Sequence, residues 1–137
     1  MSREQIDQQL CDAIVNAIEA DLSSADSASL VVSGGSTPVR LFKLLSEAAL
    51  DWSKVQVTLA DERFLPPSHE DANAKLVKEH LLVNRAAEAR FIPLVLNPAD
   101  HDLNLSQALE AFQTIQQPFS AVVLGMGTDG HFASLFP

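Results

Sequence analysis

The sequence predicts an α/β fold in which a mainly parallel β-sheet carries helices on both faces. Short runs rich in valine and leucine alternate with segments in which apolar residues recur every three or four positions. A helix between two strands makes a crossover connection, and crossovers lead to parallel sheets. The chain has 137 residues, of which 47% are hydrophobic and 20% are charged, which suits one domain with a real core. We therefore expect a single α/β domain over residues 1–137.

The first predicted helix covers residues 3–22. Its apolar residues repeat with a period near 3.6, at Ile6, Leu10, Ile14 and Ile18. Cys11 lies beside this stripe, and no cationic residue close in sequence would activate its thiol. We expect Cys11 to be a packing residue. As the single cysteine, it also excludes an internal disulfide.

The next elements continue the alternation after a polar break at residues 23–27. A strand that ends at Val32 leads into a second helix, for which Thr37 is the expected N-cap and Pro38 the expected first position. The buried face of this helix is expected to consist of Leu41, Leu44, Leu45 and Ala48. A second strand begins at Val55. Further along, the pattern predicts a helix over residues 71–83, a short strand over 91–95, a helix with apolar positions between 105 and 115, and a strand over 121–124.

Net charge and hydropathy argue against two classes of binding partner. The net charge of −9 argues against nucleic acid and against an anionic membrane surface. Apolar stretches fall short of the roughly 20 residues that a membrane span needs, and the polar start of the chain lacks the apolar core of a secretory signal. We expect a cytoplasmic protein with a small-molecule partner. The oligomeric state stays open.

A glycine-rich segment, residues 33–38 (SGGSTP), joins the first strand to the second helix. Gly34 and Gly35 would let the backbone approach a ligand, and the start of the helix would supply free amides to a phosphate. Ser36 and Thr37 could add hydroxyl donors. A plain tight turn explains the same residues equally well, so both interpretations stay open.

A charged segment, Asp61, Glu62 and Arg63, follows the second strand. Three adjacent charges usually form a surface ion cluster. Their position at a strand end favours function, with Arg63 as the natural partner of a phosphate or of a developing oxyanion. The two carboxylates would cancel much of its charge unless one of them points away.

The strongest candidate is the glycine-rich segment over residues 125–131 (GMGTDGH), which follows the fourth strand. His131 could take a proton from water near neutral pH, and the Asp129 carboxylate could orient it. The spacing does not decide whether Asp129 contacts His131 or a substrate. The other histidines share no spacing typical of metal ligands, so we expect no metal.

These three motifs, in this order, resemble the 6-phosphogluconolactonase family, and the resemblance runs over about residues 5–137. It implies a Rossmann-like fold of the lactonase type and hydrolysis of 6-phospho-D-glucono-1,5-lactone in the pentose phosphate pathway, without a cofactor. It further implies that His131, Asp129 and Arg63 are catalytic. The residues expected to bind substrate or phosphate are Gly34, Gly35, Ser36, Thr37, Asp61, Asn73 and Gly127.

Two alternatives to a complete lactonase stay open. The first alternative is a related glucosamine-6-phosphate deaminase. These enzymes typically carry a catalytic glutamate five residues after the histidine, where this chain has Phe136, which favours the lactonase. Lactonases also continue well beyond the segment that ends at Pro137. We therefore expect residues 1–137 to be the N-terminal part of a larger sugar-phosphate-binding domain, and a non-catalytic binding module is the third interpretation.

Overall fold

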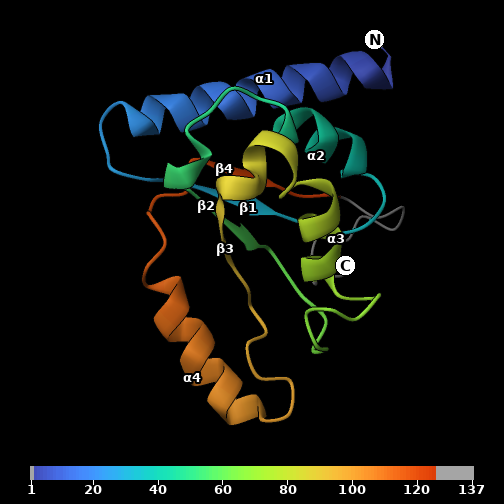
Figure 1. Ribbon diagram of the computed structural model, residues 1–137, viewed down its shortest axis with the longest axis vertical. Helices are drawn as coiled ribbons and strands as arrows, with labels where there is room; N and C mark the ends of the chain where they lie inside the picture. Colours follow the sequence, from blue (N-terminus) through green and yellow to red (C-terminus); the bar gives the residue numbers. More distant parts are fainter. Residues whose placement is uncertain (1, 126–137) are drawn as a thin grey trace.

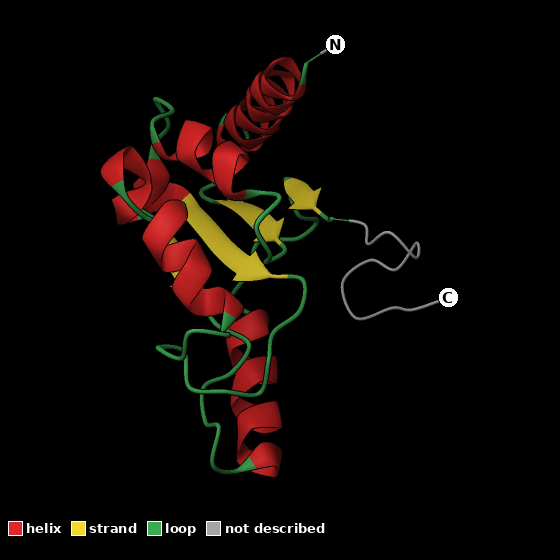
Figure 2. Ribbon diagram, turned by 90° about the vertical axis from the view of Figure 1, so that its right-hand side faces the viewer, coloured by secondary structure: helices red, strands yellow, loops and turns green. Residues whose placement is uncertain are grey.

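The computed structural model describes residues 2–125 and shows a four-stranded sheet in which every strand pairing is parallel. The strands lie in the order β3-β2-β1-β4, and the arrowheads visible in Figure 2 point toward the same side. Their bounds are β1 Ala28–Val32, β2 Val55–Leu59, β3 Arg90–Ile92 and β4 Ala121–Val123. The predicted α/β fold with a mainly parallel sheet is confirmed.

The register of the sheet brings three strand ends level with one another. Val32 at the end of β1 pairs with Leu59 of β2 on one side and with Val123 of β4 on the other. Every residue of β1 and β2 is buried, as expected for central strands of a parallel sheet. The polar segments that follow β1, β2 and β4 therefore leave the sheet at one edge.

Four α-helices accompany the sheet: α1 Arg3–Leu22, α2 Val39–Ser46, α3 Asn73–His80 and α4 His101–Phe112. Two short 3-10 helices cover Trp52–Lys54 and Asn84–Glu88. Figure 1 shows α1 across the top of the molecule, with α2 directly beneath it and α3 below α2, whereas α4 stands apart at the bottom. None of the helices between residues 2 and 125 is long and apolar enough to span a membrane.

Helix α1 has the predicted bounds, but its buried face is rotated from the predicted stripe. Ile14 and Ile18 are buried as expected, whereas Ile6 and Leu10 are 43% and 46% exposed. Asp7 and Cys11 are buried in the first half of the helix instead. The apolar spacing alone did not show that α2 packs against the Asp7 side of α1.

Cys11 is buried in the hydrophobic core, in agreement with its predicted packing role. Burial raises the pKa of its thiol above the ordinary value of 9.0, and the neighbouring Asp12 carboxylate raises this pKa further. The thiol therefore stays protonated near neutral pH and is a poor nucleophile.

Two predicted elements are shorter in the structure. The helix predicted over residues 71–83 begins at Asn73 and ends at His80, because the amides of Leu81 and Leu82 both turn back to the Val77 carbonyl. The strand predicted over residues 91–95 ends at Ile92, before Pro93, whose ring nitrogen has no hydrogen to donate to a sheet.

Helix α4 forms where its apolar spacing predicts, but most of its large apolar residues face solvent. Leu103, Leu105 and Leu109 are 44%, 54% and 57% exposed. Asn104 is the buried residue of this helix, and its side-chain oxygen accepts the backbone amides of Leu96 and Asn97. A polar contact, and not the leucine stripe, ties α4 to the chain that precedes it.

Candidate functional site

The candidate site lies at the edge where β1, β2 and β4 end together. The Gly125 amide, after β4, donates to the Ser33 hydroxyl, after β1, at 3.2 Å. This hydrogen bond joins the start of the GMGTDGH segment to the start of the SGGSTP segment. Gly127, Asp129 and His131 lie outside the described residues.

The glycine segment after β1 depends on its two glycines in different ways. Gly35 has a φ of +93°, a conformation that side chains with a Cβ rarely adopt. Gly34 is required for space, because a Cβ at this position would overlap the side chain of Asn73. The segment therefore packs directly against the chain that follows β2.

Asn73 connects the first two segments of the site. It is buried at the start of α3, and its Nδ2 donates to the Asp61 carbonyl at 3.2 Å. Its side chain also fills the space over Gly34. The structure thus brings together Gly34, Asp61 and Asn73, three of the residues that the sequence predicts to bind substrate.

Glu62 turns toward α3. Its Oε1 accepts the Asn73 amide at 2.6 Å, and its Oε2 accepts the Ala74 amide at 2.8 Å. A carboxylate at this position satisfies two amides that have no partner within the helix and interacts favourably with the helix dipole. The sequence analysis did not predict this role, because an acidic residue eleven positions before a helix gives no local signal of it.

Arg63 is exposed, and its Nη1 donates to the Asp71 carbonyl at a long 3.4 Å. Within residues 2–125 it forms no ion pair with a carboxylate. Because Glu62 is engaged with α3, this carboxylate does not neutralise Arg63 through an ion pair. The guanidinium charge is therefore available to an anion.

Thr37 is not the N-cap of α2, which corrects the sequence prediction. Pro38 is the N-cap, and no side chain within the described residues 2–125 caps the helix. The Pro38 carbonyl accepts the Phe42 amide at 2.8 Å, whereas the Thr37 carbonyl accepts Arg3 Nη2 at 3.4 Å. Ser36 and Thr37 are exposed and line a cavity along α2 that does not include Arg63.

The fold and this edge define a class of protein. Ligands of open parallel α/β sheets bind outside the carboxyl ends of the strands, and a glycine segment that leads into a helix there suits a phosphorylated small molecule. The chain belongs to the family of glucosamine-6-phosphate isomerases and 6-phosphogluconolactonases, whose family model matches residues 1–137.

The chain is similar to 6-phosphogluconolactonases of several bacteria. It is 46% identical over 130 residues to that of Rhizobium meliloti, covering 95% of this chain and 56% of the relative. It is 45% identical over 128 residues to that of Pseudomonas aeruginosa, covering 93% and 54%. A crystal structure of a 6-phosphogluconolactonase from Shewanella baltica matches with a TM-score of 0.93 and 43% identity, over 99% of this chain and 58% of that one. The chain spans little more than half the length of these relatives.

Proposed function

We propose that the protein hydrolyses 6-phospho-D-glucono-1,5-lactone to 6-phosphogluconate, in the pentose phosphate pathway and in the cytoplasm. Family membership and the names of the relatives support this activity. The observation that carries the proposal is the common edge of β1, β2 and β4, where the Gly125 amide donates a hydrogen bond to the Ser33 hydroxyl. This bond places the beginning of the segment that contains His131 beside the glycine segment.

The substrate phosphate is assigned to the glycine segment. Gly35 leaves the space beside its backbone open, Gly34 admits the Asn73 side chain close to the backbone, and Ser36 and Thr37 offer exposed hydroxyl groups. The exposed Arg63 supplies a positive charge at the same sheet edge. In a protein of net charge −9, an anionic substrate needs such a local source of positive potential.

The chemical step is assigned to His131 as general base. It removes a proton from a water molecule while the water oxygen attacks the lactone carbonyl carbon. The bond between the carbonyl carbon and the ring oxygen then breaks, and the ring oxygen takes the proton from His131 to become one of the hydroxyl groups of 6-phosphogluconate. Arg63 and backbone amides stabilise the oxyanion, and Asp129 positions His131 or a sugar hydroxyl. Gly127 and Asp61 complete the substrate site.

The test is hydrolysis of freshly prepared lactone by the protein at its full natural length, corrected for spontaneous hydrolysis. We expect His131→Ala to lower kcat by roughly 100-fold or more, as for loss of a general base. The matched control is His101→Ala, because His101 is exposed at the start of α4. Equal rates for the parent and His131→Ala would reject the assigned base, and ammonia release from glucosamine 6-phosphate would favour the deaminase.

A further inference from the structure

The cavity along α2 extends over the exposed side of this helix, beyond the glycine segment. The cavity has a volume of about 690 Å³, within the range of small-molecule sites. Residues from α1, α2 and the end of α3 line it, and several carry positive charge or hydrogen-bond donors: Arg3, Ser36, Thr37, Arg40, Lys43, His80 and Asn84. None of Asp61, Arg63 and Asn73 is among the lining residues.

Positive charge is concentrated in this cavity. Arg3, Arg40 and Lys43 are three of the nine lysines and arginines in a chain of net charge −9. Glu79 also lines the cavity, but its carboxylate is 3.7 Å from Lys75 Nζ, with which it forms an ion pair. The cavity is therefore a locally cationic surface on an acidic protein.

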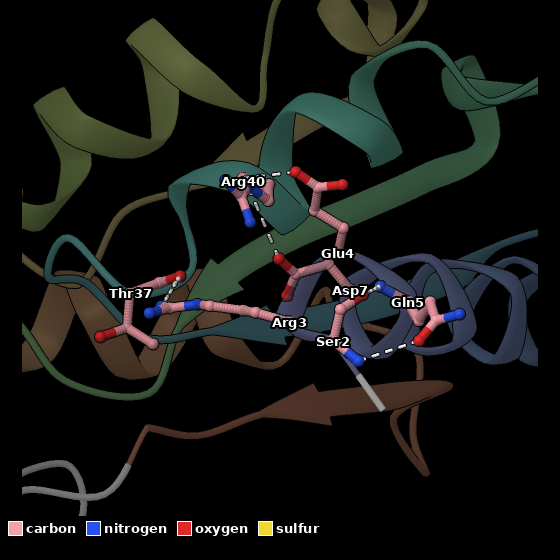
Figure 3. Close-up of polar contacts among 7 residues, drawn as sticks. All are labelled: Ser2, Arg3, Glu4, Gln5, Asp7, Thr37 and Arg40. Carbon is pink, nitrogen blue, oxygen red and sulfur yellow. Dashed lines mark hydrogen bonds and ion pairs between the residues drawn. The ribbon is translucent and has the colours of Figure 1, made fainter.

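The three cations differ in how far carboxylates neutralise them. Arg40 lies 4.0 Å from both the Glu4 and the Asp7 carboxylates (Figure 3). Arg3 and Lys43 form no ion pair with any carboxylate in the described part of the chain. Arg3 reaches back from α1 to the Thr37 carbonyl (Figure 3), which leaves most of its guanidinium N–H groups available.

We propose that this cavity binds a phosphorylated anion at a site separate from the lactone site. Arg3 and Lys43 supply the charge that remains without a carboxylate partner, whereas the Ser36 and Thr37 hydroxyls at the edge of the cavity are left to the proposed lactone site. A guanidinium and an ammonium group that line the same cavity match the several acceptor oxygens of a phosphate. Arg40 is held toward α1 by Asp7 and Glu4, so its contribution is smaller.

The probe is inorganic pyrophosphate in metal-free buffer of low ionic strength, titrated calorimetrically into the protein at its full natural length. We expect one site per chain, with affinity reduced about tenfold in Arg3→Ala and in Lys43→Ala, since each removes one charged contact. The control variant Lys54→Ala should bind like the parent, because Lys54 is ion-paired with Asp51 at 3.8 Å and lies outside the cavity. Raising the salt concentration should weaken binding.

Lactonase assays on the same variants separate this site from the proposed active site. We expect Lys43→Ala to keep the parent kcat and KM for the lactone, and Arg63→Ala to keep pyrophosphate affinity. Unchanged pyrophosphate affinity in both Arg3→Ala and Lys43→Ala would overturn the proposal. So would a rise in the KM for the lactone in Lys43→Ala, because the cavity would then be part of the lactone site. Absence of any lactonase activity would reject the proposed function and leave the binding result intact.

Discussion

The Asn73 side chain occupies the space directly over Gly34, so that the segment after β1 and the start of α3 are packed as one unit. The same side chain donates to the Asp61 carbonyl at 3.2 Å. One asparagine thus fixes the relative position of two segments that come from neighbouring strands.

Gly34→Ala should destabilise the protein by about 1–3 kcal/mol, since the new methyl group overlaps Asn73 and overpacking costs energy of this order. The measurement is the free energy of unfolding from urea titration. Asn73→Ala in the Gly34→Ala background should cost less than it does in the parent, because it frees the space that the methyl group needs. Strictly additive effects would contradict the described contact.

Glu62→Ala should cost about 1–2 kcal/mol of unfolding free energy, because it leaves the Asn73 and Ala74 amides at the start of α3 without their acceptor. Glu62→Gln retains one carbonyl oxygen as acceptor and should lose less. The neighbouring exposed glutamate Glu70 provides a matched control, and Glu70→Ala should leave stability nearly unchanged. Equal losses in the Glu62→Ala and Glu70→Ala variants would exclude a capping role for Glu62.

Arg40→Ala should reduce stability by about 1–2 kcal/mol, because it removes a guanidinium 4.0 Å from the buried Asp7 carboxylate, whose Oδ2 has no hydrogen-bond partner among residues 2–125. Asp7→Asn in the Arg40→Ala background should recover part of this loss by removing the buried charge. The urea titrations should be run without phosphate, so that the proposed anion cavity stays empty. A further loss on adding Asp7→Asn would argue against this pairing.

Cys11 should make stability depend on pH in alkaline solution. The pKa of the Cys11 thiol is higher in the folded state than in the unfolded state. The contribution of this thiol to folding stability is therefore fully present below about pH 9 and decreases as the pH rises further. Cys11→Ala should lack this component, which is measured as the difference in unfolding free energy between the two proteins from pH 7 to pH 10. A difference that does not change with pH would refute the assignment. Reaction of the native thiol with a soluble disulfide reagent at pH 8 should be slow and should accelerate on unfolding.

Local sequence patterns predicted the strands and most of the helices because those patterns are set by neighbours along the chain. The bounds of α1 and the start of β2 follow from such spacing. The buried face of α1 did not, because contact with α2 places Asp7 inside and Ile6 outside.

The contacts within the site depend on residues far apart in sequence. The glycines and Arg63 were selected by their chemistry and Asn73 by the family resemblance, but the overlap of Asn73 with Gly34 exists only in three dimensions. The same holds for Arg3, which no sequence pattern indicates and which reaches Thr37 across 34 positions. The chemistry of single residues indicates candidates for a functional site, whereas the residues that these candidates contact follow from the topology.

The solvent-facing leucines of α4 have a practical consequence for handling these 137 residues alone. Leu105 and Leu109, each more than half exposed, lie one helical turn apart and form an apolar strip on the outside of the molecule. Two copies that meet along this strip shield it from water and lower their free energy. Concentrated preparations should therefore scatter more light than dilute ones, and mild detergent should clear them.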